Sequence, residues 1–110
     1  MFEVFGFYKF KKLISLKKNK FFIQDFLIKK DIRGTVIIAN EGLNGTISGK
    51  TKDISDVINK IKEIFSIKEF DNSNTSKSKF QPFHKPKVKI KKEVVPMSLT
   101  LNSKERNLDT

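Results

Sequence analysis

The fold is decided by Gly34-Thr35-Val36-Ile37-Ile38-Ala39-Asn40-Glu41-Gly42-Leu43-Asn44-Gly45-Thr46-Ile47-Ser48-Gly49. Its first part, 34–39, is a β-branched run without polar alternation, which is typical of a strand covered by a helix and flanked by other strands. Residues 40–45 include two glycines and two asparagines, which favour a turn. Thr46–Ser48 predicts a short strand closed by Gly49, so the stretch predicts two strands joined by a reversal.

Upstream of this stretch, the sequence predicts a strand and a helix. Phe2–Phe10 is rich in aromatic and β-branched residues, which favours a strand. From Asn19 onward, apolar residues between Phe22 and Leu27 recur at helical spacing. Two lysines near Asp31 would suit the negative end of this helix, so we expect it to end there.

Downstream, the sequence predicts a second helix, a strand and a loop. Asp53 is a candidate N-cap for a helix whose apolar stripe runs over 54–65. Ile67–Asp71 predicts the fourth strand. Asn72–Ser78 contains no core-forming residue, so we expect a mobile polar loop there.

The last predicted strand starts at Lys87–Lys91, which alternates with period two, and continues through Glu93-Val94-Val95. The order of elements predicts an α+β, ferredoxin-like split βαβ fold with one extra strand. Two helices would cover one face of a mainly antiparallel sheet and leave the other face open. We expect this domain to span 1–96 and the tail 97–110 to be a linker or a disordered end.

Composition excludes several classes of function. The chain has 110 residues and no cysteine, which excludes disulfides, iron–sulfur centres, thiolate zinc sites and a cysteine nucleophile. The one histidine, His84, has no second histidine for a metal site, and we expect it in a surface loop. No apolar run approaches the length of a membrane span, and the N-terminus does not resemble a secretory signal. We expect a cytoplasmic protein with no metal and no membrane contact.

Positive charge is concentrated near the C-terminal end of the predicted domain. The net charge is +11, and residues 77–92 contain seven lysines and no acidic residue. Such a segment favours a polyanionic partner, of which RNA is the commonest. Lys87, Lys89 and Lys91 would share one face of the last strand, where they could bind phosphates. A lysine-rich coding bias would also produce this excess of charge, and lysines on an edge strand also resist strand addition.

The first predicted strand contains aromatic residues that could either belong to the core or stack on RNA bases. Strand alternation places Tyr8 and Phe10 on one face and Phe5 and Phe7 on the other. We expect these residues to belong to the core rather than to stack bases, although one of the two pairs must face away from the helices. That pair could be open to solvent, covered by the tail or packed on a second domain. The strand at 34–39 lacks the aromatic signature of RNA-recognition domains, so that specific module is excluded.

Three segments together carry a resemblance to a known family: Phe7-Tyr8-Lys9-Phe10, the Gly34–Gly49 stretch, and Pro82-Phe83 leading to Lys87-Val88-Lys89-Ile90-Lys91-Lys92-Glu93-Val94-Val95. They resemble the N-terminal domain of the bacterial rhodanese-type tRNA uridine(34) hydroxylases over nearly the whole of 2–96. The resemblance implies an acylphosphatase-like domain joined to a rhodanese domain that carries the catalytic cysteine. It also implies molecular oxygen as co-substrate and 5-hydroxyuridine at the tRNA wobble position as product.

This chain lacks the catalytic cysteine, so the resemblance implies no catalytic residue here and no activity of the chain alone. It could be an excised domain or a truncated relative. Acylphosphatase activity is disfavoured because 11–20 contains neither glycine nor arginine for a phosphate-binding loop.

Two hypotheses follow for function. In the first, the domain binds and positions tRNA, and the RNA-binding candidates are Lys79, Lys85, Lys87, Lys89 and Lys91. The loop residues Asn40, Glu41, Gly42, Asn44 and Gly45 would contact RNA or the rhodanese domain, unless the loop is only a hairpin connection. In the second, the domain docks on the rhodanese domain without contacting RNA.

Overall fold

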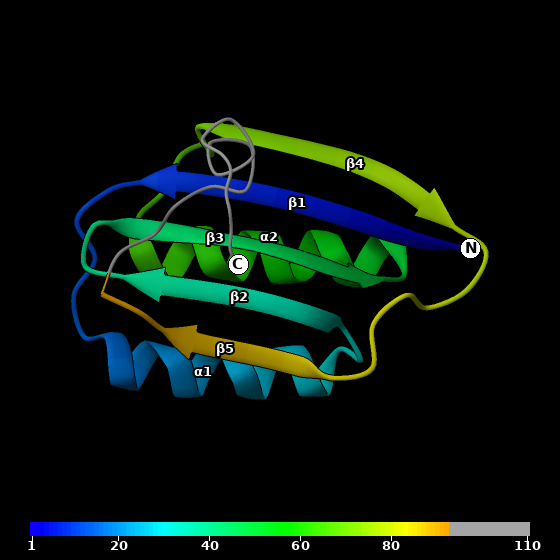
Figure 1. The fold of residues 1–110 in the computed structure, drawn as a ribbon, viewed down its shortest axis with the longest axis horizontal. Helices are drawn as coiled ribbons and strands as arrows, with labels where there is room; N and C mark the ends of the chain where they lie inside the picture. The colour runs from blue at the N-terminus through cyan, green and yellow to red at the C-terminus, as the bar shows by residue number, and fades with distance from the viewer. Residues whose placement is uncertain (93–110) are drawn as a thin grey trace, which may run out of the picture.

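The computed structural model describes residues 1–92, and these form seven regular elements. In chain order they are β1 (Phe2–Phe10), α1 (Leu16–Lys29), β2 (Arg33–Ala39), β3 (Gly42–Gly49), α2 (Thr51–Phe65), β4 (Asn72–Ser78) and β5 (Pro86–Ile90). The strands form one sheet in the order β4-β1-β3-β2-β5 (Figure 1). Neighbouring strands are antiparallel, except β2 and β5, which are parallel.

Both helices cover the same face of the sheet (Figure 1). α1 packs on β2 and β5, and α2 packs on β1 and β3. The core between the two layers contains Phe7, Leu13, Ile23, Leu27, Ile32, Val36, Ile38, Leu43, Ile47, Ile54, Val57, Ile61, Phe65, Ile67 and Val88. The predicted α+β, ferredoxin-like fold is therefore confirmed. Within the described residues, neither helix is long and apolar enough to cross a membrane.

The hairpin between β2 and β3 is tighter than the sequence predicts. Only Asn40 and Glu41 form the turn, because Ala39 and Gly42 already pair in the ladder. Residues 42–45 belong to β3, so the predicted start of this strand at residue 46 was wrong. Gly42 has φ +152°, and an added Cβ would clash with the Lys9 carbonyl oxygen. The glycine is needed for this close approach of two strands, which turn composition alone does not reveal.

α1 begins at Leu16 rather than near Asn19. Leu16 packs against the core, and the lysines that follow it are good helix formers, so the first turn forms without an apolar stripe of its own. The helix ends at Lys29, before Asp31, which has a left-handed φ of 53°. The predicted helix was thus correct in kind and shifted at its N-terminal end.

α2 begins at Thr51, and Lys50 is its N-cap residue. Asp53 lies inside the first turn, so the prediction that it caps the helix was wrong. At that position its carboxylate still interacts favourably with the positive end of the helix dipole. The predicted apolar stripe is confirmed, since Ile54, Val57, Ile61 and Phe65 are buried.

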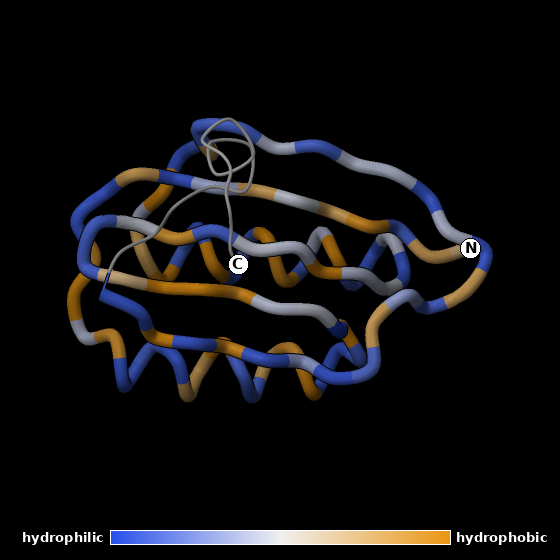
Figure 2. The backbone as a smooth tube through the Cα atoms, viewed as in Figure 1, coloured by the Kyte–Doolittle hydropathy of each residue, from blue (hydrophilic) through white to orange (hydrophobic). Residues whose placement is uncertain are grey.

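The position of the fourth strand was predicted wrongly. Ile67–Asp71 is irregular, although Ile67 is buried and the Phe70 ring packs 4.8 Å from the Phe7 ring. The strand is Asn72–Ser78, the segment expected to be a mobile loop. β4 pairs with β1 at the edge of the described sheet and is exposed along most of its length, and Figure 2 shows it hydrophilic where β2 is hydrophobic. Backbone hydrogen bonds rather than burial hold it, so no apolar alternation marks it.

β5 forms the opposite edge of the sheet, and α1 covers its outer side. The Gln24 side chain donates from Nε2 to the Pro86 carbonyl oxygen (2.8 Å) and accepts at Oε1 from the Val88 N–H (3.0 Å). This side chain thus replaces the neighbouring strand that an edge lacks. The predicted last strand is confirmed over Pro86–Ile90. Its predicted continuation through Glu93-Val94-Val95, the domain end at 96 and the tail 97–110 lie outside the described residues.

Candidate nucleic-acid interface

The sheet face opposite the helices, which we call the open face, follows from strand register. Phe7 is buried against the helices, so the even-numbered residues of β1 and their ladder partners point the other way. The open-face positions are Asn72, Asn74, Ser76 and Ser78 of β4, Phe2, Val4, Gly6, Tyr8 and Phe10 of β1, Gly42, Asn44, Thr46 and Ser48 of β3, Arg33, Thr35, Ile37 and Ala39 of β2, and Lys87 and Lys89 of β5. None of these positions in the described strands is Asp or Glu.

Lysines line the β5 edge of the open face. Val88 is buried in the core, so Lys87 and Lys89 on either side of it share the open face, as alternation predicted. Lys91 continues the line, because its N–H donates to a β2 carbonyl oxygen (2.9 Å). Alternate residues of a strand lie about 6.6 Å apart. Lys87, Lys89 and Lys91, which we call the lysine row, therefore present evenly spaced cations along one edge.

The lysine row is not paired with any carboxylate of the described residues. Within residues 1–92, none of its lysines forms an ion pair. Two lysines at the end of α1 differ, since Lys29 pairs with Asp25 at 3.0 Å and Lys30 pairs with Asp56 at 3.1 Å, whereas Lys17, Lys18 and Lys20 at its start form no ion pair within residues 1–92. The charge of the row is thus available to an anion.

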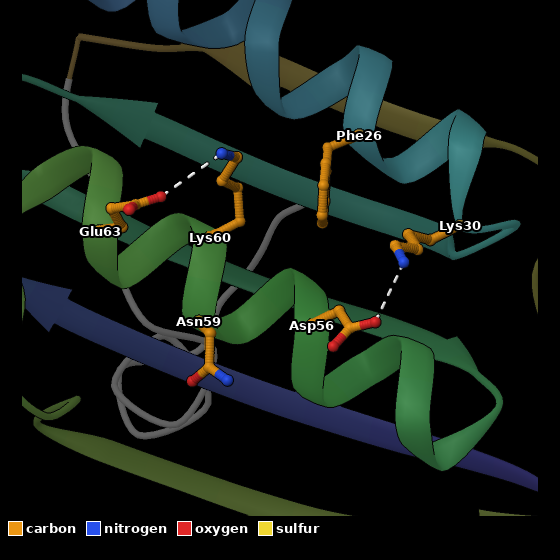
Figure 3. Close-up of a pocket in the computed structure, with 6 residues that line it drawn as sticks. All are labelled: Phe26, Lys30, Asp56, Asn59, Lys60 and Glu63. Atoms are coloured by element: carbon orange, nitrogen blue, oxygen red, sulfur yellow. Dashed lines mark hydrogen bonds and ion pairs between the residues drawn. The ribbon is translucent and has the colours of Figure 1, made fainter.

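A groove between α1 and α2 contrasts in charge with the lysine row (Figure 3). Its volume is about 410 Å³, and its lining includes Phe26, whose ring has the Nζ atoms of Lys30 and Lys60 at 5.7 and 5.6 Å from its centroid. Both lysines face carboxylates, Asp56 at 3.1 Å and Glu63 at 3.4 Å. Cations and anions are balanced here, so this groove does not suit a polyanion.

The other two lysine candidates lie in different places. Lys85 directly precedes β5, and its carbonyl oxygen accepts from the Gly34 N–H (3.0 Å), so it extends the lysine row. Lys79 directly follows β4, which is the strand at the opposite edge of the sheet. The structure therefore brings together four of the five predicted lysines and separates Lys79 from them.

Tyr8 and Phe10 lie on the open face, whereas Phe5 and Phe7 pack with Phe70 on the helical side. One pair thus faces away from the helices, as alternation predicted, and Tyr8 and Phe10 do not belong to the core cluster with Phe7. The Phe10 side chain is 46% exposed, and its ring meets that of Tyr8 edge to face at 5.8 Å. Strand alternation predicted which aromatic residues share a face. It did not predict that Phe5 and Phe7, which pack with Phe70, would be the pair that faces the helices.

One ladder row joins this aromatic pair to the lysine row. Across the sheet, the paired residues are Asn72, Tyr8, Asn44, Ile37 and Lys89. Strands lie about 4.8 Å apart, so Tyr8 and Lys89 are about 14 Å apart. The row combines amide groups, an aromatic ring and a cation on one surface.

Asp71 fixes the end of β1 that carries the aromatic pair. Its Oδ2 accepts from the Phe10 N–H (2.7 Å), its Oδ1 accepts from Lys9 Nζ (3.2 Å), and its own N–H donates to the Tyr8 carbonyl oxygen (2.9 Å). The Phe10 hydrogen bond, followed by the hydrogen bond and charge of Lys9, lowers the pKa of Asp71 despite opposing desolvation. The carboxylate therefore holds its partners best when ionised.

The predicted loop residues divide between the turn and β3. In the turn, Asn40 donates from Nδ2 to the Leu13 carbonyl oxygen (3.1 Å), and the Glu41 carbonyl oxygen accepts from the Lys11 N–H (3.0 Å). Gly42, Asn44 and Gly45 lie in β3, where Asn44 is on the open face and Gly45 lies beneath the Phe7 ring. The turn thus anchors the connection between β1 and α1. Contact with RNA or with another domain stays a prediction for these five residues.

Sequence reasoning also missed Arg33. Arg33 lies on the open face at the start of β2, and its Nε is 3.5 Å from the Asp31 carboxylate. Arg33 pairs with Ser48 of β3, and this pairing depends on the strand register, which the sequence does not show. His84 is exposed in the connection between β4 and β5. Among residues 1–92, no group of three His, Asp or Glu side chains is placed to hold a metal ion.

Solved structures place this architecture in a class. The chain is similar in fold to the acylphosphatase from Bacillus subtilis, with a TM-score of 0.56 and 11% identity over 83% of this chain and 100% of that one. It is also similar to an acylphosphatase from Coxiella burnetii, with a TM-score of 0.54 and 10% identity over 79% of this chain and 90% of that one. The fold is therefore that of an acylphosphatase-like domain.

Sequence comparison defines the family. The chain belongs to the family of the UPF0176 acylphosphatase-like domain, whose model matches residues 2–94. It is 72% identical to a tRNA uridine(34) hydroxylase of Pelagibacter ubique (strain HTCC1062), over 96% of this chain and 35% of the relative. It is 38% identical to a tRNA uridine(34) hydroxylase of Bartonella quintana (strain Toulouse), over 89% of this chain and 32% of the relative. The chain thus spans about a third of the length of these relatives.

Proposed function

We propose that this chain is the tRNA-binding and substrate-positioning domain of a tRNA wobble-uridine hydroxylase. Oxidation, with molecular oxygen as co-substrate, would take place on a rhodanese domain that carries the catalytic cysteine outside this chain. The observation that carries the proposal is the open face, whose strand positions include cations and no carboxylate. Family membership and the name of the Pelagibacter relative support tRNA as the polyanion.

The lysine row supplies the affinity in this proposal. Lys87, Lys89 and Lys91 are exposed and form no ion pair within residues 1–92, so binding a phosphate breaks no existing contact there. Phosphate contacts fix the orientation of a nucleic acid without reading its sequence. The domain would therefore hold the anticodon arm in place and leave the choice of uridine to the rest of the protein.

A salt titration tests this role. The 110-residue chain is titrated with unmodified tRNA at several salt concentrations, alongside a variant with Lys87→Gln, Lys89→Gln and Lys91→Gln. Each phosphate contact contributes about 0.7 to 0.9 to the slope of log affinity against log salt, so the variant should lower the slope by about 2 to 3. A matched control, Lys17→Gln, Lys18→Gln and Lys20→Gln, removes the same charge from exposed positions of α1.

The control separates a site from general attraction. Equal losses in both variants would show that net charge alone drives binding and would refute an interface on β5. Absence of tRNA binding even at low salt would refute the proposed role and favour the second hypothesis.

That second hypothesis, a docking module without RNA contact, is favoured by one observation on α1. Phe21, Phe22 and Ile28 expose 70%, 47% and 59% of their surface to solvent on this helix. The occupant would be the remainder of the longer polypeptide, since the chain spans about a third of its relatives. A Phe21→Ser variant that binds tRNA normally but loses association with the separately expressed remainder would assign α1 to that interface.

A further inference from the structure

We propose that Tyr8 and Phe10 form a stacking site for unpaired RNA bases on the open face. This inference rests on the proposed function, because it names the part of the RNA that the sheet contacts. The phosphates would lie toward the lysine row, and at least one base would lie on the aromatic pair. The chemical class of ligand is therefore single-stranded RNA rather than duplex.

Phe10 of the aromatic pair is exposed, and Tyr8 is partly buried. Phe10 pairs with Gly42 on β3, so its ladder partner on that side carries no side chain. Gly6 precedes Tyr8 on the same face, and the Asn74 side chain lies over it. Phe10 remains 46% exposed, and neither Tyr8 nor Phe10 belongs to the core cluster. β1 is an interior strand of the sheet, so the pair lies on the face itself and not at its margin.

Amide groups flank the pair where the edge of a stacked base would lie. Asn72 is the exposed ladder partner of Tyr8 on β4. The Asn74 amide lies over Gly6, with Oδ1 3.3 Å from the position of an added Cβ. Each amide offers both donors and an acceptor, which is the chemistry that base edges require. Single-stranded RNA is commonly held by aromatic stacking together with such edge contacts.

Distance connects the stacking site with the lysine row. Tyr8 and Lys89 are separated by three strand spacings, or about 14 Å. A short single-stranded segment can span this distance with its phosphates on β5 and a base on β1. Asp71 holds this part of β1 through the Phe10 N–H and the Tyr8 carbonyl oxygen, which keeps the site formed without a ligand.

The sequence offers a direct probe, because Tyr8 is the only tyrosine and there is no tryptophan. Intrinsic fluorescence of the 110-residue chain therefore reports on Tyr8. We expect single-stranded oligouridylate to quench this fluorescence saturably, after correction for nucleotide absorbance. A duplex RNA of equal charge, or inorganic polyphosphate, should compete with oligouridylate for binding but leave the Tyr8 fluorescence nearly unchanged.

Substitutions give the second measurement. A stacked base is worth about a 5- to 150-fold change in affinity, so Tyr8→Ala and Phe10→Ala should each weaken oligouridylate binding within that range. Tyr8→Phe keeps the ring and should bind as the wild type does. Phe21→Ala, at an exposed phenylalanine of α1, is the matched control and should have no effect. The salt slope should stay unchanged in Tyr8→Ala, unlike in the lysine variants.

The possible failures are distinguishable. If oligouridylate binds with the expected salt dependence but leaves the fluorescence of the unmodified chain unchanged, the stacking site is refuted and the proposed function stands. If no RNA binds at low salt, both the stacking site and the proposed function are refuted. Because the fluorescence test uses the unmodified chain, misfolding of a variant cannot obscure the result.

Discussion

Replacing Gln24 by methionine should release the outer edge of β5. Methionine has nearly the same length and a similar helix propensity, so packing of α1 is retained while both hydrogen bonds to the strand are lost. Those bonds join Gln24 to the Pro86 carbonyl oxygen at 2.8 Å and to the Val88 N–H at 3.0 Å. The prediction concerns the strand that carries the lysine row.

The expected loss follows from these two contacts. Each intramolecular hydrogen bond contributes about 0.5 to 1.5 kcal/mol, so the free energy of unfolding should fall by about 1 to 3 kcal/mol. With a denaturant dependence of about 1 to 3 kcal/mol per molar in urea, the midpoint should move by about 1 M. Backbone amide exchange at Val88 should also accelerate, because its N–H loses its partner.

The assay is urea unfolding followed by circular dichroism, together with hydrogen exchange at single-residue resolution. Lys20→Met, at an exposed position of the same helix, is the control and should change stability by less than about 0.5 kcal/mol. If Gln24→Met unfolds at the wild-type urea concentration and Val88 keeps its protection, the side chain does not support the β5 edge.

Two further predictions concern the Phe10 end of β1, which Asp71 holds, and the hairpin between β2 and β3. The lowered pKa of Asp71 means that its contribution to stability is present above the unfolded pKa of about 3.8 and is lost as pH falls through the folded pKa. Asp71→Asn should therefore unfold more readily than the wild type at pH 7, and the two should converge in acid when thermal midpoints are compared across pH. A difference that persists unchanged in acid would contradict this. Gly42→Ala should cost at least about 2 kcal/mol in urea unfolding, because φ is +152° and the added Cβ meets the Lys9 carbonyl oxygen. Gly6→Ala, which meets only the flexible Asn74 side chain at 3.3 Å, should cost clearly less, and equal losses would refute the steric argument.

Sequence patterns predicted the elements that are buried and missed the one that is not. The sequence pattern reveals Val36, Ile38 and the apolar stripe of α2, because burial requires apolar side chains at fixed periods. β4 is held by its backbone at an edge, so Asn72–Ser78 carries no such period. The Ile67–Asp71 segment looked more like a strand because Ile67 and Phe70 pack on the core from an irregular backbone.

The candidate site was predicted in part for the same reason. Period-two alternation correctly placed Lys87 and Lys89 on one face, since this depends on a single strand. Arg33, Asn72 and the outward position of Tyr8 depend on which strands become neighbours. Those neighbours are set by contacts far apart in the chain, which one sequence does not display.

The unequal placement of carboxylates gives the domain an electrostatic direction. Pairs such as Lys30–Asp56 and Lys60–Glu63 cancel at a distance between the two helices, whereas within residues 1–92 no ion pair cancels the lysine row, nor Lys17, Lys18 and Lys20 at the start of α1. Within the screening length of about 8 Å in physiological salt, an incoming nucleic acid would be turned toward these uncancelled lysines before any atom touches. Association should therefore be fast in dilute buffer and slow down steeply as salt is added, even where the final complex changes little in structure.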